Sequence, residues 1–399
     1  MESTVTRPTA ESSRAARIPN TLAYYYAFIV LGSITGVFGP TLTALAQQTQ
    51  TTLGEISILF ATRSFGYLIG SFLSGRLYDR IKGHPLLVLV LVVTAITFML
   101  IPLVPALWLL TAIVLVLGIA EGSIDVGGNS LLMWMHGEGS SPFLNGLHFF
   151  FGVGAFISPI IVAQVVLSTG GIAWAYWLLA IIIAPAALAL IRLPSPPPRN
   201  DSPKSTRVKT RALAVASIVL LFFLYVGAEV GYGNWVFTYA TKLNLSNATD
   251  AALLTSAFWG AFTLGRLYGV PLSARFQPAT ILLVDLIGSM ASIVAIAVFS
   301  QSSTALWLGT LGAGAFMASI FPTTLALAGR KMTITGEITG LFLVGAGCGA
   351  MFLPWLIGQL FEPLGAGVTL LLVTANLAVA LVLLVVVLGN RAQTNIVTQ

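Results

Sequence analysis

The sequence predicts an all-α membrane protein in which twelve transmembrane helices form two pseudo-symmetric halves of six helices each. Three observations carry this prediction: a strongly apolar composition, a regular succession of long apolar runs, and a sequence repeat between the two halves. Hydrophobic residues occupy 57% of the 399 positions and charged residues only 8%. Because a soluble globular protein has about 25% charged residues, most of this chain is expected to lie in a lipid bilayer.

The predicted spans follow from the length that a bilayer requires. An α-helix needs about 20 mostly apolar residues to cross the hydrocarbon core. The stretches that satisfy this requirement are 21–46, 54–77, 85–104, 107–134, 142–168, 172–192, 212–241, 251–272, 279–299, 304–328, 336–361 and 364–389. The first of them is too long for the core of a signal peptide, so we expect it to be retained as a span.

The chain is expected to divide into two helical halves with polar connections. The predicted parts are a cytoplasmic N-terminal tail at 1–20, an N-terminal half at 21–192, a cytoplasmic linker at 193–211, a C-terminal half at 212–389 and a cytoplasmic C-terminal tail at 390–399. The linker is rich in Pro, Ser and basic residues, a composition typical of an irregular connection.

The basic residues indicate the orientation. The net charge is +6, and Lys and Arg gather in the N-terminal tail and near 76–82, 192–211, 275 and 330–331. This is the asymmetry of the positive-inside rule rather than a nucleic-acid-binding face. We therefore expect an integral protein of a bacterial inner membrane with both termini cytoplasmic. A single cysteine, Cys348, leaves no disulfide framework or Cys-rich metal site.

The two halves repeat each other in sequence. LGIAEGSIDVGGNSL (117–131) aligns without gaps with LGAGAFMASIFPTTL (311–325), and GSFLSGRLYDRIKG (70–83) aligns with GRLYGVPLSARFQP (265–278). Parallel repeats of six spans are one of the architectures of secondary transporters. The sequence has no phosphate-binding Gly-x-x-x-x-Gly-Lys-[Ser/Thr] loop and no hydrolase-like motif, so a transporter that does not use ATP is favoured over an enzyme.

One short motif resembles a known family. The segment GRLYDRIKGH (75–84) resembles the loop motif between the second and third helices of the major facilitator superfamily. The resemblance implies the major facilitator fold. It also implies that Gly75 permits a tight helix end and that Asp79 and Arg80 form a charged cytoplasmic latch.

Ionisable residues inside the predicted spans need an explanation, because each costs roughly 2.5–3.5 kcal/mol at the centre of a bilayer. They are Arg63, Glu121, Asp125, His148, Glu229, Arg266 and Asp285. Glu121, Asp125 and Asn129 are spaced by four residues, which places them on one face of a helix. Their repeat counterparts are Ala315, Ser319 and Thr323, so the fold itself does not require polar groups at these positions.

Two interpretations of these residues stay open. In the first, the carboxylates have a structural role: Arg63, Arg266 or a backbone donor neutralises Glu121 and Asp125, and Arg266 pairs with Glu229. Alternatively, Asp125, Glu121, His148 and Glu229 bind and release a coupling cation, since a buried carboxylate can exchange a proton or hold a cation. We predict these four as cation-coupling residues and Arg63, Arg266, Asp79 and Arg80 as gating or ion-pair residues. No cofactor is expected besides the coupling ion, H⁺ or Na⁺.

Three stretches resemble one branch of the superfamily: DVGGNSLLMW (125–134), NGLHFFFGVGAFISP (145–159) and YVGAEVGYGNWVFTYA (225–240). They are similar to the sodium-dependent glucose transporters and, more distantly, to the fucose–proton symporters. The symporters use a fourth-helix acid followed four residues later by Asn, and the resemblance implies this role for Asp125 and Asn129. Their first-helix acid has no counterpart between Thr21 and Gln47, so the identity of the cation stays open.

The residue types suit a sugar as substrate. Amides and carboxylates bind hydroxyl groups, and aromatic rings cover the C–H faces of a sugar. The predicted substrate-binding residues are Asn129, Asn145, Asn234, Gln164, Trp235, Tyr232 and Trp259. The function predicted is transport of a hexose-like sugar by alternating access, coupled to a proton or sodium gradient. The expected partners are this small molecule and the lipid bilayer, with no nucleic acid, and the expected state is a monomer.

Two other functions compete with this prediction. A proton-coupled exporter of drugs or other small organic solutes would use a buried acid as counter-charge for an organic cation. A non-transporting sensor that kept the fold would be expected to carry a long soluble signalling domain, whereas the predicted tails are short.

Glycines recur at four-residue spacing within the predicted spans. The pairs are Gly66 and Gly70, Gly118 and Gly122, and Gly345 and Gly349. Small residues at this spacing allow two helix backbones to approach closely, so close helix packing is expected at each pair.

Overall fold

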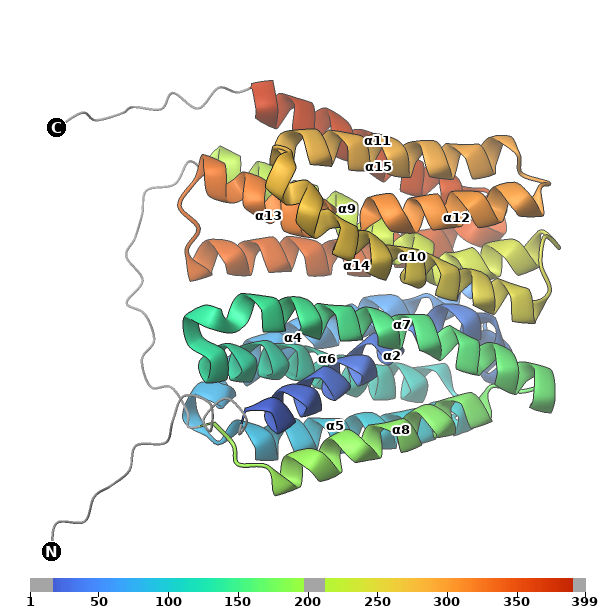
Figure 1. The fold of residues 1–399 in the computed structure, drawn as a ribbon. Coiled ribbons are helices and arrows are strands. Elements are labelled where there is room, and N and C mark those ends of the chain that lie inside the picture. Colours follow the sequence, from blue (N-terminus) through green and yellow to red (C-terminus); the bar gives the residue numbers. More distant parts are fainter. Residues whose placement is uncertain (1–16, 197–211, 390–399) are drawn as a thin grey trace, which may run out of the picture.

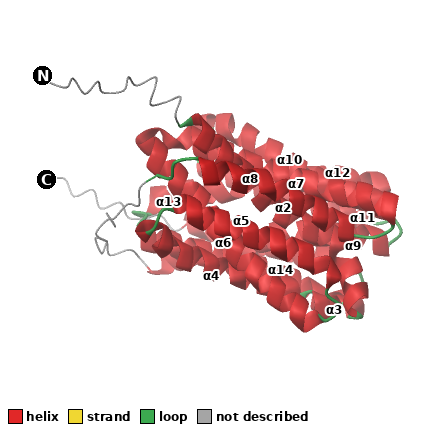
Figure 2. Cartoon of the chain, turned by 90° about the horizontal axis from the view of Figure 1, so that it is seen from below, coloured by secondary structure: helices red, strands yellow, loops and turns green. Residues whose placement is uncertain are grey.

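The computed structural model describes residues 17–196 and 212–389, and within these ranges it consists of helices and loops without strands. The long helices lie side by side in two groups, α2 to α8 and α9 to α15, which we call the N-terminal and C-terminal halves (Figure 1). The same helices seen from below are joined by short loops (Figure 2). The predicted all-α class is therefore confirmed. Most of the predicted linker and tails lies outside the described residues.

The helices begin and end close to the predicted boundaries. The N-terminal half contains α2 (Ile18–Thr49), α3 (Leu53–Ile56), α4 (Ile58–Arg80), α5 (Gly83–Leu100), α6 (Leu107–His136), α7 (Ser141–Thr169) and α8 (Ala173–Arg192). The C-terminal half contains α9 (Ala212–Lys242), α10 (Ala248–Arg275), α11 (Pro278–Val298), α12 (Ser303–Met317), α13 (Ile320–Lys331), α14 (Gly336–Leu364) and α15 (Val368–Gly389).

Eleven of the helical segments in the described part of the chain are long and apolar enough to cross a membrane, with α3–α4 and α12–α13 each counted as one segment. The remaining predicted span corresponds to α10. This helix has 28 residues, enough to cross a bilayer at 1.5 Å per residue, but no stretch of it is as apolar as those in the eleven segments. It packs against α7, α9 and α12 inside the same bundle.

The tenth predicted span is not one continuous helix, which corrects the expected helix at 304–328. It is divided into α12 and α13 at Ala318 and Ser319. Pro322 has no N–H to bond the carbonyl of Ala318, four residues earlier, and its ring crowds that carbonyl. The hydroxyl of Tyr225 lies 2.8 Å from the carbonyl oxygen of Met317 at the break. The repeat counterpart of Pro322 is Gly128, and α6 continues through it.

The expected close packing at the glycine pairs is confirmed. At the interface of α4 and α6, a Cβ built on Gly70 would lie 2.1 Å from the carbonyl oxygen of Ile119, and one built on Gly118 would lie 2.2 Å from that of Arg63. Gly349 meets Phe223 in the same way, so α9 and α14 are also in backbone contact. Side chains at these positions would force the helices apart. The glycines therefore set the distance and register between α4 and α6.

Gly70→Ala is expected to destabilise the protein, because its methyl group would overlap the Ile119 backbone and cannot be accommodated by rotating a side chain. The measurement is thermal unfolding of the purified protein in detergent. Gly75→Ala on the same helix is the matched control, since a Cβ there meets nothing within 4 Å. Equal unfolding temperatures for the two variants would contradict backbone contact at Gly70.

Hydrogen bonds between the two halves lie at one end of the bundle, opposite the end at which α8 finishes and α9 begins (Figure 1). Glu362 Oε1 accepts from the Leu53 N–H at 3.1 Å, and Gln359 Nε2 donates to the Gly54 carbonyl at 2.7 Å. Gln359 also donates to the Ser57 hydroxyl at 3.2 Å, and Ser57 donates to the Trp355 carbonyl at 3.3 Å. We call these contacts of α3 with the end of α14 the outer contact. Elsewhere in the described chain no hydrogen bond joins the halves.

Candidate functional site

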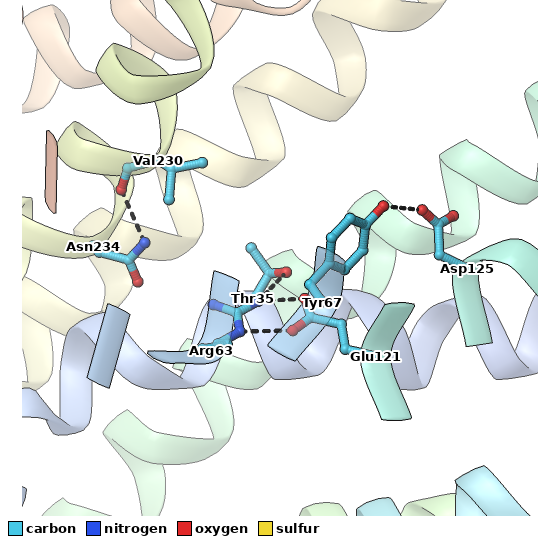
Figure 3. A network of polar contacts seen from close by, with 7 residues as sticks. All are labelled: Thr35, Arg63, Tyr67, Glu121, Asp125, Val230 and Asn234. Carbon is cyan, nitrogen blue, oxygen red and sulfur yellow. Dashed lines mark hydrogen bonds and ion pairs between the residues drawn. The ribbon is translucent and has the colours of Figure 1, made fainter. Parts of the chain in front are cut away.

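Arg63 and Glu121 form a buried salt bridge between α4 and α6 (Figure 3). The Arg63 Nη2 lies 2.5 Å from Glu121 Oε1, and Arg63 Nε donates to Oε2 at 2.8 Å. Arg63 Nη2 also donates to the Thr35 hydroxyl of α2 at 3.0 Å. The guanidinium carbon lies 5.3 Å from the centre of the Phe38 ring. The charge of Glu121 is thus neutralised, which is the first of the two interpretations considered for it.

Asp125 lies one helical turn from Glu121 and has a different environment. Its Oδ2 accepts a short hydrogen bond from the Tyr67 hydroxyl of α4 (Figure 3). Its Oδ1 accepts from Asn129 Nδ2 at 2.8 Å. The side chain is half-buried, and among the described residues no cationic side chain forms a salt bridge with it. Asp125 is therefore a carboxylate held by neutral donors and without a counter-cation.

Tyr67 is the residue of this group that sequence reasoning missed. It lies four residues after Arg63, the same spacing that separates Asp125 from Glu121. Equal spacing on two packed helices places the two contacts, Arg63 with Glu121 and Tyr67 with Asp125, one helical turn apart. That matched spacing is the signal in the sequence that could have identified Tyr67.

Glu229 and Arg266, whose ion pair is one of the two interpretations left open by the sequence, form no salt bridge in the described part of the chain, so the direct ion pair is not found. Glu229 accepts a hydrogen bond from Tyr225, four residues earlier on α9. The guanidinium of Arg266 lies over the Phe262 ring, 4.5 Å from its centre and four residues earlier on α10. Each side chain thus finds a partner on its own helix.

The remaining intramembrane groups lie apart from Asp125. The exposed ring of His148 on α7 meets the Phe28 ring edge-on, with the ring centres 5.8 Å apart. No hydrogen bond joins His148 to Asp125 in the described chain, so the structure does not bring these two coupling candidates together. Asp285 is buried and accepts a hydrogen bond from Ser319, the repeat counterpart of Asp125.

Four of the predicted substrate-binding side chains are buried in this conformation, and the ring of one of them, Trp235, also meets Phe60 of the N-terminal half, with the ring centres 6.1 Å apart. Tyr232, Asn234, Trp235 and Trp259 are each at most 1% exposed. Trp235 donates to the Pro354 carbonyl at 2.9 Å and stacks on Phe361. Asn234 donates to the Val230 carbonyl at 2.9 Å (Figure 3). These residues serve packing here and present no surface to a ligand.

The other predicted contacts are accessible. Asn129 is half-buried beside Asp125, and Asn145 is exposed on α7 three residues before His148. Gln164 is exposed further along α7. The amides that remain available to a ligand in this conformation therefore belong to the N-terminal half.

The predicted latch is not formed in this conformation. Neither Asp79 nor Arg80 makes a hydrogen bond or salt bridge with any described residue. Arg80 is the last residue of α4. Gly75 lies inside that helix, so the expected tight helix end at Gly75 is wrong.

Comparisons with known proteins agree with the fold and the sequence motifs. Residues 24–345 match the Major Facilitator Superfamily. Sodium-dependent glucose transporter 1 of Xenopus laevis is 34% identical over 355 residues, which cover 81% of this chain and 72% of the relative. Sodium-dependent glucose transporter 1A of Mus musculus is 29% identical, covering 84% of this chain and 88% of the relative. The predicted resemblance to this branch is thus confirmed.

A solved structure supports the same assignment at the level of the fold. The nucleoside transporter NupG superposes on this chain with a TM-score of 0.78, covering 93% of this chain and 99% of that one. Its sequence identity is 14%, so the likeness concerns architecture alone. Family match, relatives and fold agree that the chain is an integral membrane protein that belongs to the major facilitator superfamily of transporters and is not an enzyme.

Proposed function

We propose that this protein moves a hexose-like sugar across the membrane by alternating access and couples the movement to a proton or sodium gradient through Asp125. The observation that carries the proposal is the contrast between the two carboxylates of α6. Glu121 is neutralised by Arg63, whereas Asp125 is half-buried and has only neutral hydrogen-bond donors.

An uncompensated carboxylate inside a membrane protein is costly, and such residues commonly mark ion or proton pathways. Of the intramembrane carboxylates that form no salt bridge with a described residue, Glu229 and Asp285 are buried whereas Asp125 is half-buried, so its charge is the one that a mobile cation can reach and neutralise. Asn129 on the same face is available to hydroxyl groups of a substrate. The relatives named sodium-dependent glucose transporters support a sugar as that substrate.

The distribution of contacts between the halves supports alternating access. The outer contact closes the end of the bundle opposite the end of α8 and the start of α9, and the positive-inside pattern of the sequence supports a cytoplasmic position for the latter side. In this view the structure is closed on the outer side. Rocking of one half against the other would break the outer contact and open that side.

A covalent bridge across the outer contact is expected to arrest transport. Gly54→Cys and Gln359→Cys, combined with Cys348→Ser, place two thiols on α3 and α14, whose native residues are hydrogen-bonded. A short bifunctional maleimide should abolish uptake in the double variant and leave both single variants active. Full uptake by the bridged protein, verified by mass spectrometry, would contradict opening at this end.

The substrate class is tested with purified protein in proteoliposomes. Uptake of a radiolabelled hexose is measured under an inward proton or sodium gradient, with unlabelled hexoses and nucleosides as competitors and with dye efflux as a separate assay. Gradient-dependent hexose uptake that hexoses inhibit more strongly than nucleosides is the expected result. Dye efflux without hexose uptake would identify an exporter and refute the proposal.

A further inference from the structure

Tyr67 reaches Asp125 from the neighbouring helix α4 and donates its hydroxyl to the Oδ2 atom. We infer that Tyr67 is a positioning residue whose hydroxyl competes with the coupling cation for this oxygen and thereby sets the affinity for the cation. The inference rests on the proposed role of Asp125 as the coupling group. It applies to a proton and to a sodium ion alike, because both bind at a carboxylate oxygen.

The packing of α4 on α6 fixes the Tyr67 backbone opposite α6. A Cβ built on Gly122 of α6 would lie 2.2 Å from the Tyr67 carbonyl oxygen, so the two backbones touch at this level. One turn away, the Arg63–Glu121 salt bridge ties the same two helices together. The backbone of Tyr67 therefore cannot drift relative to Asp125, and only its side chain is free to respond to what binds there.

Both oxygens of Asp125 are already occupied by donors. Oδ2 accepts from Tyr67 and Oδ1 accepts from Asn129, whose Nδ2 also lies 3.0 Å from the Asp125 carbonyl. An ionised carboxylate only accepts hydrogen bonds. Each carboxylate oxygen can accept two hydrogen bonds, so a cation at Oδ2 shares that oxygen with the Tyr67 hydrogen and weakens the hydrogen bond by repulsion, and a proton there turns the oxygen from an acceptor into a donor.

A displaced Tyr67 hydroxyl has an alternative acceptor on its own helix. Ser71 follows Tyr67 by four residues, so the two side chains lie on one face of α4. The Ser71 Oγ is buried next to the Tyr67 hydroxyl and makes no well-formed hydrogen bond with the described residues in this conformation. When the cation binds, the Tyr67 O–H can turn from Asp125 to Ser71, which keeps the buried hydroxyl hydrogen-bonded.

Among the described residues, Tyr67 is the group from a neighbouring helix whose hydrogen bond to Asp125 competes with the cation. From α4 the nearby charged group is Arg63, which is neutralised by Glu121. From α6 itself, Glu121 and Asn129 face Asp125. In the described chain, no hydrogen bond or salt bridge from α2, α5 or α7 reaches the Asp125 side chain. Removing the Tyr67 hydroxyl thus changes the donors on the carboxylate without changing any charge.

The test is Tyr67→Phe in proteoliposomes, with hexose uptake measured as a function of the cation. Sodium is varied at constant pH, and in a second series pH is varied without sodium, so the effects of sodium ions and of protons are measured separately. The half-saturating concentration of the effective cation should fall about tenfold, because one hydrogen bond to a charged group no longer competes. The KM for hexose at saturating cation should stay unchanged.

A second variant, Ser71→Ala, is expected to shift the half-saturating cation concentration in the opposite direction. Ser71→Ala removes the alternative acceptor and leaves the displaced Tyr67 hydroxyl unpaired, so the half-saturating cation concentration should rise. Tyr225→Phe is the matched control, because it removes the hydroxyl that binds Glu229 in the other half. This control should leave the cation requirement unchanged.

The outcomes separate this inference from the proposed function. An unchanged or raised half-saturating concentration in folded Tyr67→Phe would overturn the inference; a raised value would make the hydroxyl a ligand of the cation instead of a competitor. If Tyr225→Phe alone changes the cation requirement, coupling lies at Glu229 and the inference also fails. Gradient-driven accumulation that persists in Asp125→Asn would refute the proposed coupling role itself.

Discussion

Asp125→Asn is expected to abolish gradient-driven accumulation of hexose while exchange of internal for external hexose partly continues. Asparagine keeps the shape of the side chain and can still accept from Tyr67 or Asn129, but it cannot carry the charge that binds a cation. Exchange needs no net movement of the cation, so it does not require that charge. The measurement compares accumulation under an imposed proton or sodium gradient with exchange in preloaded proteoliposomes.

Glu229→Gln is the matched control for this experiment. Like Asp125, Glu229 accepts a hydrogen bond from a tyrosine, in this case Tyr225 of its own helix. Unlike Asp125, it is buried, with 9% of its surface exposed, and lies in the C-terminal half. The control is expected to retain accumulation. Wild-type accumulation by Asp125→Asn would exclude Asp125 as the coupling group. Loss of exchange with unchanged hexose binding would instead assign it to gating.

Glu121→Gln is expected to reduce stability rather than coupling. The substitution leaves the guanidinium of Arg63 buried, 8% exposed, without its negative partner. Removing one member of a buried ion pair typically costs about 3–5 kcal/mol. The unfolding temperature in detergent and the yield of monodisperse protein should both fall, while Asp125→Asn should stay close to the wild type in the same measurements.

Replacing both members of the pair tests whether the loss comes from an unpaired charge. Arg63→Leu with Glu121→Met removes both charges and keeps an apolar contact between α4 and α6, and such replacements are often neutral or stabilising. The double variant is therefore expected to be more stable than Glu121→Gln. If the double variant is the less stable of the two, the cost arises from lost hydrogen bonds to Thr35 and from packing rather than from charge.

The positions of the helices follow from the sequence because the bilayer imposes a simple requirement. Every backbone polar group must be bonded within the span, and each span must be about 20 apolar residues long. The runs at 107–134 and 142–168 appear as α6 (Leu107–His136) and α7 (Ser141–Thr169). The glycine pairs at four-residue spacing also indicated which helix faces pack against a neighbouring helix, because small residues at that spacing allow two backbones to come into contact.

The sequence also identified Glu121, Asp125 and Asn129 as one polar face of a single helix, but it could not distinguish the two carboxylates. Glu121 meets Arg63 and Asp125 meets Tyr67 because the glycines lock α4 and α6 in one register. Likewise, Trp235 and Tyr232 look suitable for a sugar in the sequence, yet both are fully buried in the structure. The fold class, the spans and the polar face were determined locally, by hydropathy and helical periodicity. Which charge is neutralised, which is left for a cation and which aromatic rings are buried depend on contacts between distant segments, and only the tertiary structure decides those.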